Sequence, residues 1–203
     1  MIVIIDYGLG NLKSVYNALK KINCLCKISS SVEDIKQAKG IILPGVGTFN
    51  DCMNNLKKSN LIDTIIKEVK SGKPLLGICL GMQILFEKGY EGAEVEGLGL
   101  LKGEVVKMVS SEVKIPHIGW NNLEKNREDE LLDGIKENAF VYYVHSYCVS
   151  NYNEEDLVAY SDYGDIKIPG LVRRKNVMGA QFHPEKSAED GLKILKNFKE
   201  LVL

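Results

Sequence analysis

Short apolar runs alternate with amphipathic stretches along the first 90 residues of the chain. The run IVII, at 2–5, is followed by 11–22, in which Leu12, Val15 and Leu19 recur at helical spacing. The same order repeats three more times, with strands predicted over 24–28, 40–45 and 73–78, and helices over 31–38, 49–70 (interrupted at Ser59 and Asn60) and 82–88. Continuous apolar strands that alternate with helices are typical of a parallel sheet covered by helices on both faces.

Strands dominate the pattern in the second half of the chain. They are predicted over 103–108, 113–120, 140–147, 166–175 and 177–184, with few helical runs between them. A last helix is predicted over 189–203, where Leu192, Leu195 and Phe198 recur at helical spacing. The predicted fold class is therefore α/β, with a flavodoxin-like parallel sheet, helices on both faces and antiparallel strands added in the second half. No linker, repeat or low-complexity tract divides the chain, so residues 1–203 are expected to form one domain.

Composition and charge argue against several classes of protein. The chain has 203 residues, 45% of them hydrophobic, which is enough for one well-buried domain. Lys and Arg total 26 and Asp and Glu total 27, so neither a nucleic-acid partner nor a membrane surface is expected. No stretch approaches the apolar length of a membrane span, and the first strand lacks the basic leader and cleavage site of a signal peptide.

Neither a cofactor nor a metal is expected from the motifs. The five cysteines are odd in number and form no C-x-x-C pair, which argues against a disulfide framework or a zinc site and favours a reduced, cytoplasmic chain. The stretch GLGNLK, at 8–13, matches the dinucleotide fingerprint only in part, because Lys13 stands at the third glycine. No cluster of His, Cys, Asp and Glu has the spacing of metal ligands.

Cys79 lies between two glycines in the stretch GICLG, where a predicted strand meets a predicted helix. Such junctions lie at the carboxyl edge of a parallel sheet, where these folds bind ligands. G-x-C-x-G is the thiol counterpart of the nucleophile elbow, in which glycines relieve the crowding of a sharp turn. The amide groups and dipole of the following helix are expected to favour the thiolate. We predict that Cys79 is a nucleophile, and that the other four cysteines are core residues.

His183 is the best candidate for a general base among the three histidines. It ends an apolar run, is followed by Pro184, and has Glu185 two residues on. In extended chain, residues i and i+2 face the same side, so Glu185 is expected to hydrogen-bond the ring of His183 and fix its tautomer. His117 and His145 have no carboxylate nearby in the sequence and are interpreted as structural residues.

The stretch LPGVG, at 43–47, ends another predicted parallel strand. Its two glycines allow the backbone amides of Val46 and Gly47 to approach a ligand, as an oxyanion hole requires. The amide of Leu80, directly after the nucleophile, is the expected second donor. P-G-x-G is also found in ordinary tight turns, but its position beside Cys79 favours the oxyanion hole.

The stretches GICLGMQ and FHPE resemble the motifs of the class I (triad) glutamine amidotransferases, whose thiol releases ammonia from the side-chain amide of glutamine. Further stretches are similar to one branch of this family, the glutaminase subunits of imidazole glycerol phosphate synthases. They run from residue 5 to 187 and are IDYGLGNL, LPGVGTF, PHIGWN, VYYVHSY and QFHPEKS. The resemblance therefore covers essentially the whole chain, without a departure at a catalytic position.

This resemblance implies roles for named residues. Cys79 would form a γ-glutamyl thioester, His183 would transfer the proton to ammonia, and Glu185 would orient His183. Glutamine would be bound by Gly47, Gln83, Ser146 and Tyr147. The implied partner is a (β/α)8-barrel cyclase subunit, which forms a heterodimer with the glutaminase and uses its ammonia. The implied contacts with this cyclase are Asn11, Trp120 and Lys186.

Other functions remain compatible with the residues. One is the glutaminase subunit of another amidotransferase, such as that of anthranilate synthase, or a stand-alone γ-glutamyl hydrolase. Another is a flavodoxin-like binding module that keeps the elbow only as scaffold. An intact set of Cys79, His183 and Glu185 argues against the binding module.

Overall fold

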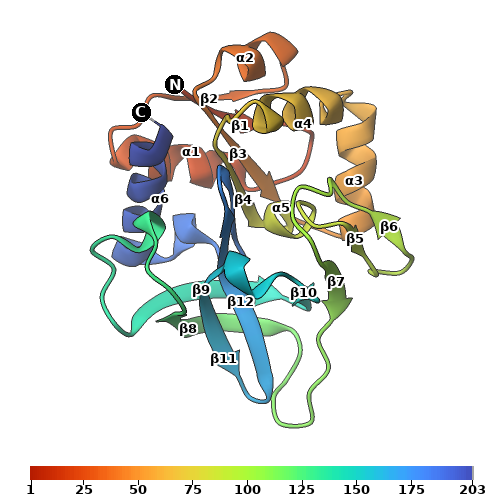
Figure 1. The fold of residues 1–203 in the computed structure, drawn as a ribbon, viewed down its shortest axis with the longest axis vertical. Helices are drawn as coiled ribbons and strands as arrows, with labels where there is room; N and C mark the ends of the chain where they lie inside the picture. The colour runs from red at the N-terminus through yellow and green to blue at the C-terminus, as the bar shows by residue number, and fades with distance from the viewer. Residues whose placement is uncertain (203) are drawn as a thin grey trace.

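A nine-stranded mixed sheet forms the centre of the computed structural model, which describes residues 1–202 (Figure 1). The strand order is β2-β1-β3-β4-β13-β12-β11-β8-β9. The parallel strands are β1 (Ile2–Ile5), β2 (Cys26–Ser29), β3 (Gly40–Gly45), β4 (Leu75–Cys79) and β13 (Val177–Ala180). The antiparallel strands are β8 (His117–Lys125), β9 (Ala139–His145), β11 (Leu157–Tyr163) and β12 (Ile166–Arg174). The order 2-1-3-4 at the parallel end is the flavodoxin-like one that the sequence predicts.

Helices cover both faces of the parallel half. The helices α1 (Leu12–Lys21) and α6 (Ala188–Val202) pack on one face, and α2 (Val32–Gln37), α3 (Phe49–Lys58) and α4 (Ile62–Lys70) pack on the other. Alternate residues of β1 show the division, because Ile4 contributes to the core under α1 and α6 while Val3 and Ile5 contribute to the opposite one. None of the helices within residues 1–202 is both long and apolar enough to cross a bilayer.

A smaller sheet lies beside the main one. Its order is β10-β7-β5-β6, with β5 at Lys88–Gly89, β6 at Val95–Glu96, β7 at Glu104–Lys107 and β10 at Tyr147–Ser150. Single 3-10 turns occur at η1 (Glu130–Leu132), η2 (Glu154–Asp156) and η3 (Pro184–Lys186). The chain changes from the main sheet to the smaller one at Ser146, between β9 and β10. The strand predicted over 140–147 is therefore two strands in two sheets.

Most of the predicted elements of the first half are confirmed. The helix at 49–70 is interrupted where expected, with Asn60 in a left-handed conformation at φ 57°. Ser31 caps α2 by accepting a hydrogen bond from the amide of Asp34. The second half differs in one strand, because β13 runs parallel to β4 instead of forming an antiparallel addition. The strand β11 was not predicted.

The helix predicted over 82–88 is wrong. The helix α5 covers only Leu80–Gln83. The carbonyls of Ile84, Leu85 and Phe86 accept hydrogen bonds from amides of residues 98–101, so they are not available to continue a helix. All three of these side chains are buried. Tertiary hydrogen bonds and burial on every side have therefore overridden a local helical pattern.

The elbow between β4 and α5 depends on close approach of backbone to backbone. A Cβ atom on Gly81 would lie 1.8 Å from the carbonyl oxygen of Leu43, and one on Gly77 would lie 2.5 Å from the carbonyl oxygen of Gly81. A Cβ atom on Gly45 would lie 2.5 Å from the amide nitrogen of Gly81. Glycine at these three positions lets the ends of β3 and β4 and the start of α5 pack together.

We expect Gly81→Ala to lower the free energy of unfolding by about 3 kcal/mol or more, because the new methyl group can be accommodated only by moving backbone. The matched control is Gly99→Asn, at an exposed position with φ 61° and no atom within 4 Å of an added Cβ, where the cost should be about 1 kcal/mol or less. Urea unfolding of both variants measures the difference. Equal stabilities would contradict the packing argument.

Candidate active site

Cys79 ends β4 in a strained backbone conformation. Its φ of 55° and ψ of -115° are uncommon for a residue with a side chain. In the sheet, Gly45 of β3 lies beside Cys79, and Ala180 of β13 lies beside Ile78. The ends of three parallel strands therefore meet at the thiol, as the nucleophile elbow predicts.

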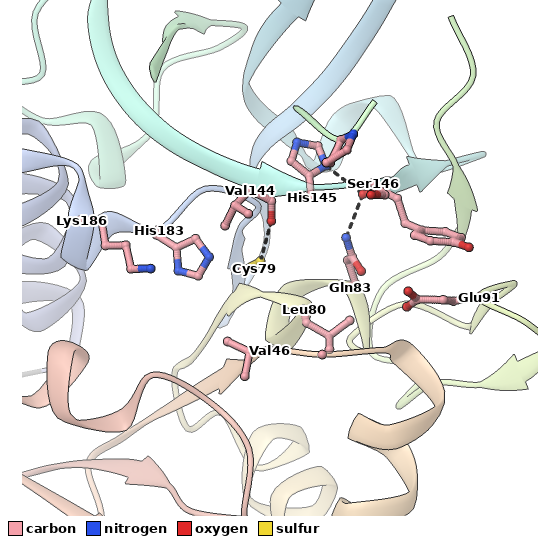
Figure 2. A pocket seen from close by; sticks show the side chains of 13 residues that line it. Val46, Cys79, Leu80, Gln83, Glu91, Val144, His145, Ser146, His183 and Lys186 are labelled. Carbon is pink, nitrogen blue, oxygen red and sulfur yellow. Dashed lines mark hydrogen bonds between the residues drawn. The ribbon is translucent and has the colours of Figure 1, made fainter. Parts of the chain in front are cut away.

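The thiol of Cys79 lies in a mostly enclosed position, 7% exposed. Its Sγ is 3.9 Å from the carbonyl oxygen of Val144 (Figure 2). It is also 4.0 Å from Nε2 of Gln181. The helix that follows it has only four residues, so its dipole is weaker than the predicted seven-residue helix would supply. The local electrostatics of the thiol therefore depend mainly on side chains and on the first amides of α5.

His183 and Glu185 form the expected hydrogen bond. His183 Nδ1 lies 2.8 Å from Glu185 Oε1, and the two side chains are only 4% and 0% exposed. The segment between them is not extended, because residues 184–186 form the 3-10 turn η3. The carboxylate accepts from Nδ1–H and thus leaves Nε2 for the cavity.

Ser187 holds the turn η3 against the sheet. Its hydroxyl donates to the carbonyl of His183 at 2.7 Å and accepts from the amide of Tyr142 at 2.9 Å. The amide of His183 donates to the carbonyl of Tyr142 at 2.9 Å. Three hydrogen bonds thus fix His183 relative to β9. Sequence reasoning missed Ser187, because its partner on β9, Tyr142, lies 45 residues away along the chain.

The pKa of His183 is raised to about 9. Burial alone would lower it, but hydrogen bonds and charge interactions with Cys79 and Glu185 raise it by more. At neutral pH the ring is therefore an imidazolium beside a sulfur atom. This arrangement suits a thiolate nucleophile with a proton donor at hand.

The end of β3 is held in place by a hydrogen bond from Tyr7. The hydroxyl of Tyr7 donates to the carbonyl of Pro44 at 2.6 Å. Sγ of Cys52 lies 2.9 Å from the same hydroxyl, and burial raises the pKa of Cys52 to about 12, so a protonated thiol donates to Tyr7. Beyond Pro44, Gly47 has φ 96° with nothing within 4 Å of an added Cβ. The loop at 46–47 is thus anchored on one side and open on the other.

A cavity of about 440 Å³ opens over Cys79 (Figure 2). This volume lies within the range of about 300–1,000 Å³ that is usual for small-molecule sites. Most of the residues predicted from the sequence line it, namely Val46, Gly47, Cys79, Leu80, Gln83, Ser146, Tyr147, His183 and Lys186. The lining residues that were not assigned are Glu91, Pro116, Val144 and His145.

Gln83, which the resemblance places in the glutamine pocket, uses its amide group for hydrogen bonds within the protein. Its side chain is 4% exposed, and its Nε2 donates to the carbonyl of Tyr147 at 2.9 Å and to Oε1 of Gln181 at 3.0 Å. Both amide protons are therefore committed within the protein. Only the carbonyl oxygen of Gln83 remains to contact a bound molecule directly, and its amide holds the backbone of Tyr147 at the cavity wall.

Glu91 places a carboxylate on the wall of the cavity opposite Lys186 (Figure 2). Its Oε2 accepts a hydrogen bond from the amide of Phe49 at 2.8 Å, which fixes the side chain against the start of α3. No sequence motif surrounds Glu91, which lies two residues after the end of β5, beyond the helix predicted over 82–88. The cavity thus carries an anionic group at one end and a cationic group at the other.

The outer face of the β8–β9 hairpin is apolar and exposed. Ile118, Trp120, Phe140 and Val144 are 59%, 50%, 51% and 37% exposed, and cross-strand pairing places Ile118 opposite Val144 and Trp120 opposite Tyr142. We call these five side chains the hairpin face. Nζ of Lys186 lies 6.0 Å from the ring centre of Tyr142, so Lys186 lies at the rim shared with the cavity. Asn11 lies apart from them, at the first turn of α1, which packs against η3.

Within residues 1–202, no group of three or more His, Cys, Asp and Glu side chains is arranged so that it could hold a metal ion. The residues that line the cavity include the thiol of Cys79, the imidazolium of His183, the carboxylate of Glu91 and the amino group of Lys186. Such a set can carry out acyl transfer by nucleophilic attack and proton transfer.

Comparisons with known proteins agree on one family. A family model described as glutamine amidotransferase class-I matches residues 3–201. Proteins named imidazole glycerol phosphate synthase subunit HisH, from Oceanobacillus iheyensis and Lactococcus lactis, are 49% and 52% identical over 100% and 98% of this chain and 100% and 98% of their own.

Two solved structures share the fold. A glutamine amidotransferase crystal structure superposes with a TM-score of 0.78 at 22% identity, covering 100% of this chain and 99% of that chain. The structure of PurLQS from Thermotoga maritima gives a TM-score of 0.78 at 21% identity, covering 100% and 98%. At this level of identity the likeness concerns the fold alone.

The raised pKa of His183 predicts how stability changes with pH. The folded pKa is about 9 and the unfolded one about 6.5, so protonation of His183 contributes stability that is fully present below pH 6.5 and is lost as the pH rises through 9. Glu185→Gln removes the carboxylate charge, so we expect a lower pKa of His183 and a smaller loss of stability over this range. Ring NMR titration and urea unfolding measure the two effects.

The matched control is Glu189→Gln, which neutralises an exposed carboxylate in the first turn of α6 and should leave the pKa of His183 unchanged. A pKa of His183 that is the same in Glu185→Gln as in the wild type would show that Glu185 does not support the imidazolium.

Proposed function

Because the chain belongs to the class I glutamine amidotransferase family, we propose that it hydrolyses glutamine to glutamate and ammonia as the glutaminase subunit of an imidazole glycerol phosphate synthase. The observation that carries this proposal is the cavity over Cys79, which brings the elbow thiol together with His183, itself bonded to Glu185. Relatives about half identical in sequence over their whole length bear the name of this synthase subunit.

In the proposed reaction, the sulfur of Cys79 attacks the carbon of the side-chain amide of glutamine. The carbon–nitrogen bond breaks, and the proton of the His183 imidazolium goes to the departing nitrogen, which leaves as ammonia. A γ-glutamyl thioester remains on Cys79. Water then attacks this thioester, gives a proton to the now neutral His183, and releases glutamate together with the thiolate. Glu185 keeps the ring of His183 in one tautomer throughout.

The negative charge that develops on the oxygen of the substrate's side-chain amide must be stabilised by hydrogen-bond donors. We assign these to the backbone amide of Leu80 and to the loop of Val46 and Gly47, which lie on the ends of neighbouring strands. The open position of Gly47 would allow its peptide to turn toward or away from the cavity. An oxyanion hole of this kind can be idle at rest and become active when the loop is reorganised.

The ends of the cavity match an amino acid. Glu91 provides a carboxylate for the α-amino group of glutamine. The backbone at Ser146 and Tyr147 provides polar groups for the same amino-acid end of the substrate. Gln83 contributes by fixing the carbonyl of Tyr147, with its own oxygen left to contact the substrate. The reactive amide of glutamine would then lie over Cys79.

The proposed partner is a (β/α)8-barrel cyclase subunit, which forms a heterodimer with this chain and receives the ammonia. The hairpin face supports this proposal, because exposed apolar patches of this kind mark protein interfaces. Lys186 and Val144 border both the hairpin face and the cavity, so a partner seated there would lie next to the departing ammonia. Trp120 would be an aromatic anchor, and Asn11 and Lys186 would be polar contacts around it.

We further propose that residues 1–203 form one amidotransferase domain that acts in the cytoplasm. The strand β13 comes from the end of the chain, yet it lies between β4 and β12 in the main sheet, which ties the two halves of the chain together. The five cysteines are buried thiols, as a reducing compartment favours.

The proposed nucleophile has a direct test. We expect Cys79→Ala to lower glutamate release from glutamine by at least about a thousandfold, since the attacking atom is removed. Synthesis of imidazole glycerol phosphate from added ammonium salt, measured with the cyclase present, should be retained. Cys148→Ala is the matched control, because Cys148 is a buried thiol on β10 of the smaller sheet, and burial raises its pKa to about 11. Glutamate release by the Cys79 variant would refute the proposed mechanism.

The proposed docking surface predicts that substitutions in it weaken cyclase binding and the activation of glutamate release by the cyclase. Trp120→Ala should weaken binding of the cyclase by about 2 kcal/mol, and Lys186→Ala should reduce the rise in glutamate release that the cyclase and its phosphoribosyl substrate produce. Both variants should keep the stability of the wild type. Leu25→Ala, which removes an apolar side chain 69% exposed away from the hairpin face, is the control. Full glutaminase activity of the isolated chain would instead indicate a stand-alone hydrolase.

A further inference from the structure

Two histidines outside the proposed triad form a buried pair, in which His145 lines the cavity and His117 lies behind it. Nδ1 of His117 lies 3.1 Å from Nε2 of His145, and the two residues are 3% and 7% exposed. The ring of His117 is stacked between Tyr143 and Tyr163, with ring centres 4.7 Å and 4.0 Å away. This packing allows His117 little freedom to reorient, and the pair has one geometry.

The carbonyl of Tyr147 determines which ring nitrogens of the pair carry protons. Nδ1 of His145 lies 2.9 Å from the carbonyl of Tyr147, which can only accept, so His145 carries its proton on Nδ1. A neutral His145 then accepts at Nε2, and His117 must donate from its own Nδ1. Burial lowers the pKa of both rings to about 4, so both are neutral at neutral pH, as this arrangement requires. The hydrogen bonds thus run in one direction, from His117 through His145 to Tyr147.

The carbonyl of Tyr147 is held by two separate elements. It accepts from His145 of β9 and from Nε2 of Gln83 in α5. These bonds fix the segment where the chain leaves the main sheet, because Ser146 belongs to neither β9 nor β10. His145, Ser146 and Tyr147 all line the cavity. The amide of Met108 also donates to the carbonyl of Ser146 at 2.9 Å, so the backbone is held from the smaller sheet, and the histidine pair adds the support from the side of β9.

We infer that His117 and His145 are positioning residues, and that their hydrogen-bonded pair holds the wall at Ser146 and Tyr147 in the conformation that binds the amino-acid end of glutamine. This inference depends on the proposed function for the identity of the ligand. His117 does not line the cavity, so it acts through His145. The effect of losing the pair should therefore fall on substrate affinity and leave the thiol itself unchanged.

The test compares two reagents that both modify Cys79. One is a glutamine-shaped diazo ketone, which must occupy the cavity before its diazo carbon takes a proton from His183 and the thiolate displaces N₂ from that carbon. The other is iodoacetamide, which needs only access to the thiol and loses iodide. We expect His117→Phe, which keeps an aromatic ring but removes the donor, to raise the half-saturating concentration of the diazo ketone about tenfold. The rate with iodoacetamide should be unchanged.

A conservative variant separates positioning from general damage. His117→Asn places an amide N–H where Nδ1–H stood, so it should restore the half-saturating concentration to near the wild-type value. Tyr163→Phe is the matched control, because it deletes the hydrogen bond from the stacked Tyr163 ring to the carbonyl of Lys114 but leaves the pair intact. Half-saturating concentrations that are equal in the wild type and His117→Phe would overturn the inference.

A measurement on the unaltered chain keeps the inference testable if His117→Phe does not fold. Nitrogen NMR of the three histidines should show Nδ1–H tautomers for His117 and His145 and a scalar coupling across the hydrogen bond between their rings. Absence of this coupling would overturn the inference. A wild-type chain whose labelling by the diazo ketone does not saturate would instead overturn the proposed function, and the two failures are therefore distinguishable.

Discussion

The active-site geometry depends on the contact between Gly81 and the carbonyl of Leu43. Because no Cβ stands between them, the first turn of α5 rests directly on the end of β3. This contact brings the loop at 46–47 close to the thiol of Cys79, whose own backbone is strained at φ 55° and ψ -115°. The strain at Cys79 is supported by packing from strands on both sides, which is how such a conformation persists in a folded chain.

The reactive groups could be predicted from short sequence motifs, in which the residues that matter are near neighbours in the chain. The glycines around Cys79 and the carboxylate two residues after His183 are short motifs whose geometry is set locally, and both are present as expected. Ser187, Glu91 and Tyr7 could not be found in this way, because each meets its partner across 37 or more residues of chain. The same reason explains why the helix predicted over 82–88 is wrong. The carbonyls of residues 84–86 accept hydrogen bonds from amides of residues 98–101, which lie later in the chain.

The three histidines show how similar burial leads to opposite charge states. His183 has a carboxylate at 2.8 Å and a thiol in front of it, and its pKa rises to about 9. His117 and His145 have only each other, a backbone carbonyl and tyrosine rings, and their pKa values fall to about 4. Burial disfavours the imidazolium in all three cases, so the hydrogen bonds and charge interactions with Cys79 and Glu185 decide that His183 is the ring that can carry a proton to a leaving group. The neutral pair of His117 and His145 is suited instead to holding the backbone at Tyr147 through a hydrogen bond.

The β8–β9 hairpin links these features, because alternate residues of its strands face opposite sides. His117 and His145 point inward at one paired position of the two strands, and Ile118 and Val144 point outward at the next. The carbonyl of Val144 faces Cys79 while its side chain belongs to the exposed apolar face. A partner that pressed on the outer side of the hairpin would therefore act on the same two strands that carry the cavity wall. The cavity and the apolar face are two sides of one thin layer, so binding on one side can influence the other without a long pathway.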